Sequence, residues 1–217
     1  MSLLSLNLGQ PELLPDPFAR EGGEPTHRTA IRKRPAEGPV WLGRLGLAGD
    51  EVADHRHHGG PDQAVLAYAG VHYATWRAEL GDHPVLLPGG FGENLTVEGT
   101  DETTACLGDV WEIGGARLEV SLPRMPCETL ARRFGIRDFV KRVARCGRTG
   151  WYLRVLREGL VEAGTPVTLL ERPFPAWTVV QAFRVMLDAR APEGLRRELA
   201  SCPALAEKTR RRLASGG

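Results

Sequence analysis

The segment SLPRMPCET, residues 121–129, places one cysteine behind two prolines and close to an arginine. Proline fixes φ at about −65° and favours extended backbone in the residue before it, so the segment predicts a stiff connection from a strand to a helix. Cys127 would lie at the start of that helix, where free N–H groups lower the pKa of a thiol, and Arg124 would add positive charge. Such a thiolate could act as a nucleophile or bind a soft metal; the alternative is a small buried apolar residue at a strand end.

Three histidines in the run HRHHGGPD, residues 55–62, form a second candidate. The H-x-H spacing could chelate a metal from a strand, but no cysteine or carboxylate lies at a sequence distance usual for zinc. His58 directly precedes two glycines, which allow a ligand to approach the backbone closely, and a histidine there could donate a hydrogen bond or a proton. His58 is therefore the predicted functional residue, and a turn with solvated histidines is the alternative for His55 and His57.

The loop GRTG, residues 147–150, is a third candidate. Backbone N–H groups around Gly147, the guanidinium of Arg148 and the hydroxyl of Thr149 are all groups that bind phosphate. The loop is neither a GxGxxG motif nor a Walker loop, and an ordinary turn is the alternative.

The loop FGENL, residues 91–95, is a fourth candidate because it places Glu93 and Asn94 directly before an apolar strand. An asparagine amide can offer a donor and an acceptor together to the edge of a heterocycle. The alternative is an Asx turn, in which the side chain bonds to its own backbone.

The elements that would hold these residues are mostly short strands. Glycine (26 residues) and proline (16 residues) are abundant, which favours strands and turns over long helices. Two β-hairpins are predicted, one turning at Gly114-Gly115 and one at Glu158-Gly159. Further strands are predicted at 2–8, 29–32, 40–47 and 63–68, and helices at 71–80 and 128–145; the rest of 11–39 is expected to be loop-rich.

The last part of the chain, residues 177–214, has helix patterns and no strand pattern. Thr178 and Gln181 form a T-x-x-Q capping box, and Pro192 and Pro203 suit the first turns of two further helices. The sequence therefore predicts a β-rich domain over residues 1–172 and a small three-helix domain over residues 173–217.

The bulk properties exclude several classes of protein. The formal net charge is +1, so nothing global favours nucleic acid or a membrane surface as a partner. No apolar run approaches the roughly 20 residues that span a bilayer, and the start lacks a basic region and a cleavage site typical of a signal peptide. The four cysteines have no CxxC spacing, so we expect a reduced, cytoplasmic protein without a disulfide framework.

Taken together and in order, these motifs resemble the MOSC family, the molybdenum cofactor sulfurase C-terminal domain, and above all its YiiM-like branch, which carries a C-terminal three-helix (3-alpha) extension. The resemblance is specific between residues 45 and 159, and the stretch 11–39 matches least. The matching blocks are LGLAGDEVADHRHHGGPDQAVLAY (45–68), HYATW (72–76), FGENLT (91–96), CLGDVWEIG (106–114), LEVSLPRMPC (118–127) and GRTGWYLRVLREG (147–159).

The resemblance implies a mostly β fold with some α, a MOSC-type β-barrel domain followed by a small three-helix C-terminal domain. It implies a molybdenum cofactor (molybdopterin), a pyranopterin dithiolene with a terminal phosphate, and Cys127 as the ligand of molybdenum. Reductases of the family remove oxygen from N-hydroxylated compounds such as 6-hydroxylaminopurine, with electrons from a separate flavoprotein reductase. The chain has no flavin or NAD fingerprint, which agrees with an external donor.

With that cofactor, His58 would be a proton donor or a cofactor contact near the metal. The other predicted contacts are Gly147, Arg148 and Thr149 to the phosphate or pterin, and Arg124, Glu93 and Asn94 along the same pocket. Two alternatives remain open: a module that binds the cofactor or carries sulfur without turnover, and a thiolate or zinc hydrolase that uses Cys127 and the histidines.

Overall fold

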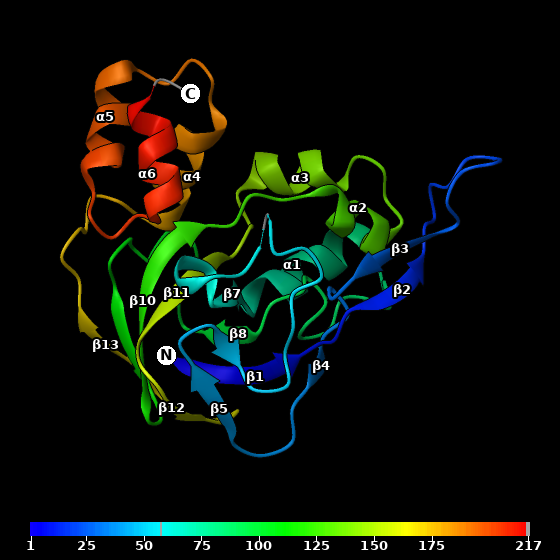
Figure 1. Ribbon diagram of the computed structural model, residues 1–217, viewed down its shortest axis with the longest axis horizontal. Helices are drawn as coiled ribbons and strands as arrows, with labels where there is room; N and C mark the ends of the chain where they lie inside the picture. The colour runs from blue at the N-terminus through cyan, green and yellow to red at the C-terminus, as the bar shows by residue number, and fades with distance from the viewer. Residues whose placement is uncertain (57, 216–217) are drawn as a thin grey trace.

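The computed structural model describes residues 1–56 and 58–215, and its centre is an eight-stranded sheet (Figure 1). The strands lie in the order β13-β9-β10-β11-β7-β8-β1-β4. Neighbouring strands are antiparallel except β7 and β8, which are parallel and joined through a helix. Along the chain these strands are β1 (Ser2–Leu8), β4 (Arg34–Pro35), β7 (Val65–Ala69), β8 (Leu95–Glu98), β9 (Val110–Ile113), β10 (Ala116–Pro123), β11 (Trp151–Arg157) and β13 (Val167–Glu171).

The sheet closes on itself near the N-terminus. The Leu3 N–H donates to the Thr165 carbonyl (3.0 Å), and the Val167 N–H donates to the Met1 carbonyl (2.9 Å), which joins β1 to the start of β13. Closure pairs backbone groups that would otherwise be exposed at a sheet edge. The β-rich domain predicted from the residues and the barrel implied by the family resemblance are thereby confirmed.

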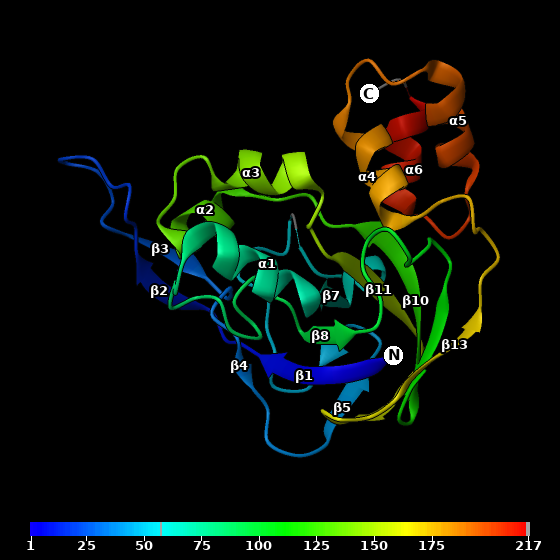
Figure 2. The ribbon, with the colours of Figure 1, turned by 180° about the vertical axis from the view of Figure 1, so that it is seen from behind.

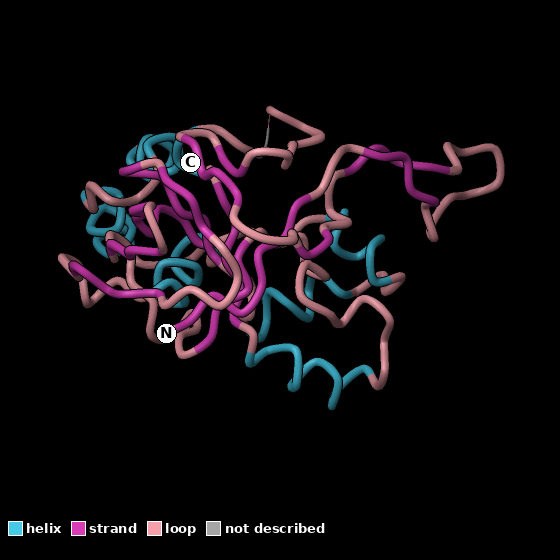
Figure 3. Tube along the Cα trace, turned by 90° about the horizontal axis from the view of Figure 1, so that it is seen from below, coloured by secondary structure: helices cyan, strands magenta, loops and turns pink. Residues whose placement is uncertain are grey.

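Two smaller sheets flank the barrel. One contains β5 (Val40–Gly43), β6 (Gly46–Leu47) and β12 (Gly159–Val161), and the other contains β2 (Glu12–Pro15) and β3 (Thr26–Thr29). Figure 3 shows the β2–β3 hairpin projecting away from the rest of the chain. The strand predicted at 29–32 lies instead at 26–29, and the one predicted at 40–47 is two strands around a tight turn.

Three helices and a 3-10 turn, η1 (Pro61–Gln63), complete the first part of the chain. Helix α1 (Val71–Leu80) agrees with its prediction, but the helix predicted at 128–145 is two helices, α2 (Glu128–Phe134) and α3 (Phe139–Cys146). Gly135 ends α2 with a φ of 65°, which glycine adopts without steric cost. These helices enclose an aromatic core that includes Tyr68, Tyr73, Trp76, Phe91, Phe134 and Phe139.

The tail contains α4 (Val179–Leu187), α5 (Glu193–Ser201) and α6 (Glu207–Ala214), gathered at one end of the barrel (Figure 2). The predicted capping box is present at the start of α4, but Pro192 is the N-cap of α5 and Pro203 precedes α6 by four positions. Buried tail residues such as Val179 and Leu205 belong to the same apolar cluster as the barrel interior. In the described part of the chain, no helix is long and apolar enough to cross a membrane.

Candidate functional site

A pocket of about 250 Å³ lies beside the first turn of α2, where distant parts of the chain meet. One wall is formed by residues between Arg28 and Lys33, on β3 and directly after it, and a second by residues between Asp50 and Gly59. Cys127 and Arg124 line it from the connection between β10 and α2. The other lining residues are Gln63, Ala64, Leu66, Gly92, Asn94, Thr129 and Tyr152.

Cys127 is the N-cap residue of α2, with extended backbone at φ −127° and ψ 167°. Burial alone would raise the pKa of its thiol, but a hydrogen bond from His58, the positive charge of Arg124 and the Leu130 N–H together lower that pKa to about 6. A thiol with this pKa is mostly thiolate at neutral pH. The predicted electropositive cysteine at a helix start is therefore present, and it faces a pocket.

His58 reaches the thiol from the glycine-rich turn between Asp54 and η1. Its backbone N–H donates to the Asp54 carbonyl (3.0 Å), and Gly59 follows with a φ of 78°. The phenolic oxygen of Tyr152, on β11, lies 3.4 Å from Nδ1 of His58. The structure thus brings His58 together with Cys127 as predicted, whereas His55 is exposed and His57 lies outside the described residues.

Arg124 is buried, with 5% of its surface exposed, and lines the pocket. Its backbone N–H donates to the Gly150 carbonyl (3.0 Å), which fixes the residue just after β10. Its side-chain Nη1 has no hydrogen-bond partner in the described part of the chain. A buried guanidinium nitrogen without a partner is costly, so this group is suited to an anion bound in the pocket.

A second buried cation lines the pocket at Lys33, which forms an ion pair with Asp50. Burial lowers the pKa of the Lys33 ammonium, although the charge of Asp50 opposes this shift. The Asp50 carboxylate also accepts hydrogen bonds from the Gly9 N–H (2.7 Å) and the Asn94 amide (2.8 Å). Lys33 and Asp50 were missed from the sequence: Lys33 lies in the loop-rich stretch 11–39, and Asp50 lies in the matching block 45–68, where no local signal singled it out.

Asn94 lines the pocket as predicted, but its side chain is used by the protein itself. Its Oδ1 accepts the Leu66 N–H (3.1 Å), and its Nδ2 donates to the Asn7 carbonyl (3.2 Å) and to Asp50. The amide therefore ties β7 to β1 and holds Asp50 in place. This arrangement leaves Asn94 as a support of the pocket wall.

Glu93 lies outside the pocket, in contrast to its predicted place. Its fully buried carboxylate accepts hydrogen bonds from Tyr73 (2.6 Å), Thr96 (2.8 Å) and the backbone of Gly89 (2.8 Å) and Phe91 (3.1 Å). Burial raises the pKa of Glu93, while these donors oppose the shift. The residue fixes the loop that carries Asn94, which is a structural role.

The GRTG loop also lies outside the pocket, which corrects the prediction that it cradles a phosphate there. The Arg148 guanidinium donates to Glu79 (2.5 Å) and lies over the Trp76 ring, 3.9 Å from its centroid. Gly147 ends α3 with a φ of 76°, and the Thr149 hydroxyl donates to the Gly150 carbonyl (3.0 Å).

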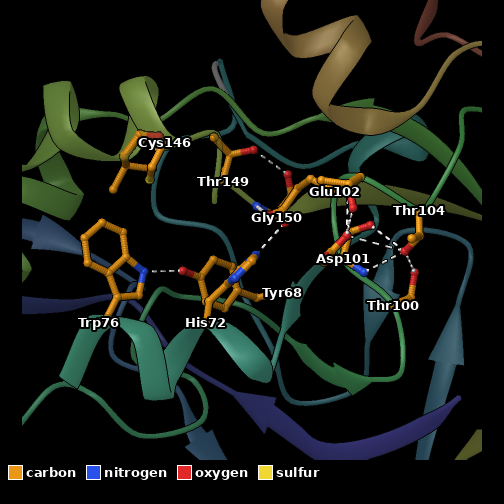
Figure 4. A network of polar contacts seen from close by, with 12 residues as sticks. Tyr68, His72, Trp76, Thr100, Asp101, Glu102, Thr104, Cys146, Thr149 and Gly150 are labelled. Carbon is orange, nitrogen blue, oxygen red and sulfur yellow. Dashed lines mark hydrogen bonds and ion pairs between the residues drawn. The ribbon is translucent and has the colours of Figure 1, made fainter. Parts of the chain in front are cut away.

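Gly150 connects this loop to a buried polar network (Figure 4). Its N–H donates to Glu102 (2.7 Å), whose other carboxylate oxygen lies 2.5 Å from Nε2 of His72. Its carbonyl accepts the Arg124 N–H, so the network holds the backbone of a residue that lines the pocket. The loop thus affects the site through the position of Arg124.

The other three cysteines lie apart from the pocket. Cys106 and Cys202 are buried, and burial raises the pKa of both thiols. Cys146 is exposed at the end of α3. Among the described residues, Cys127 is the cysteine that lines the pocket.

Comparison with known proteins identifies related chains. A family model described as "MOSC domain" matches residues 54–168. "Uncharacterized protein YflK" of Bacillus subtilis is 45% identical over 171 residues, which is 79% of this chain and 74% of that protein. A protein named "Reductase" from Gibberella moniliformis is 42% identical over 167 residues, which is 76% of this chain but only 29% of that protein.

Solved structures extend the similarity to the tail. The crystal structure of YiiM from Geobacillus stearothermophilus matches with a TM-score of 0.81 and 31% identity, covering 99% of this chain and 98% of that one. YiiM from Escherichia coli matches with a TM-score of 0.75 and 30% identity, covering 84% and 86%. The arrangement of barrel and helical tail is therefore shared with YiiM structures.

Proposed function

We propose that this chain, which belongs to the MOSC domain family, binds a molybdenum cofactor (molybdopterin) in its pocket and reduces N-hydroxylated compounds. The observation that carries the proposal is the pairing of a low-pKa thiolate at Cys127 with the buried guanidinium of Arg124, whose Nη1 has no partner among the described residues, in one pocket. A soft metal prefers a thiolate ligand, and an anionic cofactor needs buried cations.

The residues present fit such a group. Cys127 would bind molybdenum, and Arg124 and Lys33 would hold the anionic parts of the cofactor. When bound, the cofactor would supply the two electrons that break an N–O bond. The reduction of a hydroxylamine to an amine and water also consumes two protons.

His58 would deliver one of these protons at the pocket. It hydrogen-bonds to Cys127, and the Tyr152 hydroxyl lies 3.4 Å from its Nδ1, so the pair could hold and pass a proton. Residues 28–33 and 50–54 would enclose the substrate and limit the access of water.

An external flavoprotein reductase would supply the electrons. The sequence has no flavin or NAD fingerprint of its own. The relative named "Reductase" is much longer than the part that matches this chain, so its additional length could contain functions that this chain obtains from a partner.

The second candidate is a module that binds the cofactor or carries sulfur on Cys127 without turnover. The same thiolate favours it, since a nucleophilic sulfur could hold a persulfide. Turnover with a reduced artificial donor separates the two functions.

The test is to produce the protein in a host that synthesises the cofactor and to measure molybdenum, pterin and reduction of 6-hydroxylaminopurine. Cys127→Ser should abolish turnover. Arg124→Ala should weaken cofactor binding about 10- to 100-fold, the effect of losing a charge-assisted hydrogen bond, and should therefore lower the occupancy that remains after dialysis. Arg148→Ala is the matched control and should keep occupancy, because Arg148 pairs with Glu79 outside the pocket. Absence of molybdenum and pterin, or full turnover in Cys127→Ser, would contradict the proposal.

A further inference from the structure

The turn that carries His58 is held at its far end by the helical tail. Asp62, in η1, accepts the Glu207 N–H on its Oδ2 (2.8 Å) and the Nε–H of Arg154 on its Oδ1 (3.0 Å). Glu207 is the first residue of α6, and its N–H is one of the donors that a helix leaves free at its start. A carboxylate from a distant part of the chain therefore caps α6, where negative charge is favourable.

Further hydrogen bonds fix the same junction. Ser121, on β10, donates its hydroxyl to the Asp62 carbonyl (2.6 Å), and its own carbonyl accepts the Ala206 N–H (2.9 Å). Arg154 also donates to the Ala204 carbonyl (2.9 Å). The connection between α5 and α6 is thus bonded to β10, to β11 and to η1, and its residues 204–206 are buried.

This junction affects the pocket because only a short segment of the chain separates it from His58. Gly59 and Gly60 lie between His58 and η1, with φ values of 78° and 87°. Glycine permits this backbone conformation but restrains it less than any other residue. The orientation of His58 therefore depends on how firmly the end of the turn is held.

We infer that Asp62 is a positioning residue: by binding the start of α6, it holds the turn so that His58 stays within hydrogen-bond reach of Cys127. The catalytic consequence rests on the proposed function. The positioning itself does not, since it is a property of the cofactor-free protein.

The test removes one donor from α6. Proline is tolerated at the first position of a helix, so Glu207→Pro deletes the N–H that Asp62 accepts and should leave α6 intact. Ala206 is already extended, with φ −46° and ψ 130°, as a residue before proline should be. Glu207→Ala is the matched control, because it loses the exposed pair with Arg211 but keeps the N–H. Asp62→Asn tests the same contact by changing the acceptor of the hydrogen bond.

In the cofactor-free protein, hydrogen exchange of the Gln63 amide should be about tenfold faster in Glu207→Pro than in Glu207→Ala, as expected for the loss of one hydrogen bond to a charged group. The ring nitrogen NMR signals of His58 should shift in Glu207→Pro and Asp62→Asn and stay in place in Glu207→Ala.

In the loaded protein, turnover per bound molybdenum should fall about 5- to 10-fold in Glu207→Pro and Asp62→Asn with little change in KM, because a misplaced group lowers kcat.

Each outcome decides the inference. Gln63 exchange and His58 signals that are the same in Glu207→Pro and Glu207→Ala would overturn it. Altered signals with unchanged turnover per molybdenum would show that Asp62 positions His58 but would overturn the catalytic consequence of that positioning. If the wild-type protein binds no molybdenum, the proposed function fails, and the exchange and NMR measurements alone decide whether Asp62 positions His58.

Discussion

At the scale of single residues, the groups around each sulfur give Cys127 a different thiol pKa from Cys106 and Cys202. Cys127 has a cation, a histidine and a helix start around it, whereas at Cys106 and Cys202 burial outweighs the nearby polar groups and raises the thiol pKa. The low dielectric of burial disfavours every thiolate, and only specific positive groups reverse that effect. The chemistry of the site therefore depends on the groups that surround the sulfur.

The first prediction concerns the pH dependence of this thiol. In the cofactor-free protein, alkylation of Cys127 by iodoacetamide should reach half its maximal rate at about pH 6, because the thiolate is the reactive form and its pKa is lowered. His58→Ala removes a hydrogen bond that favours the thiolate, so the midpoint should rise by about 1 pH unit. Mass spectrometry of each cysteine-containing peptide gives the rates. A wild-type midpoint near the ordinary thiol value of about 8.5 would contradict the prediction.

At the scale of the elements, the connection from α3 into β11 supports the pocket without lining it. Gly150 donates to Glu102 and accepts from Arg124, and it packs so closely on β7 that a Cβ atom there would lie 2.5 Å from the Ala67 carbonyl oxygen. This approach, together with a φ of 78°, excludes any other residue without a shift of the backbone.

The second prediction follows from the close packing of Gly150 on β7. Gly150→Ala should lower the free energy of unfolding by about 2–5 kcal/mol, since it adds a collision with backbone to an unfavourable φ. Gly135→Ala is the control: its φ is 65°, but nothing lies within 4 Å of the added Cβ, so about 1–2 kcal/mol is expected. Denaturant unfolding of both variants measures the difference. Equal losses would show that the Gly150 contact relaxes freely.

At the scale of the whole molecule, the barrel and the tail share one apolar core. Val179, Ala182, Leu199 and Leu205 are each 0% or 1% exposed and belong to the cluster that fills the barrel. The boundary at residue 172 stays a prediction as a division of the sequence, but these residues would leave one side of the core uncovered if the tail were removed. Among the described residues, the tail contributes none to the pocket lining.

The third prediction is that a chain truncated after residue 172 does not form the native barrel. Loss of these buried side chains exposes apolar surface of β10 and its neighbours, and each large buried side chain is worth about 1.5–3 kcal/mol. Near-UV circular dichroism and thermal unfolding of the cofactor-free protein measure the effect. A truncated chain that unfolds cooperatively at the wild-type temperature would contradict it, and would support an independent barrel domain.

The sequence by itself determined the mostly β class of fold and singled out Cys127. Strand alternation, the hairpin at Gly114-Gly115 and the capping box at Thr178 follow from local patterns, and all three are present in the structure. The hairpin predicted at Glu158-Gly159 is wrong, because β11 pairs with β10 and β7 while β12 pairs with β5. Cys127 could be identified from a local pattern as well, because its prolines and its helix start are neighbours in sequence. His58 was found because glycines beside a histidine allow close approach of other groups.

Only the tertiary structure decided which polar residues share the pocket with Cys127. Lys33 lies in the loop-rich stretch 11–39, and no local signal singled out Asp50 or Tyr152 within the matching blocks; the fold brings all three beside α2. Arg148 has the right chemistry for a phosphate, but Glu79 and the Trp76 ring already bind its guanidinium. The direction in which a side chain points depends on long-range pairing and packing, and local sequence contains too little information to fix either.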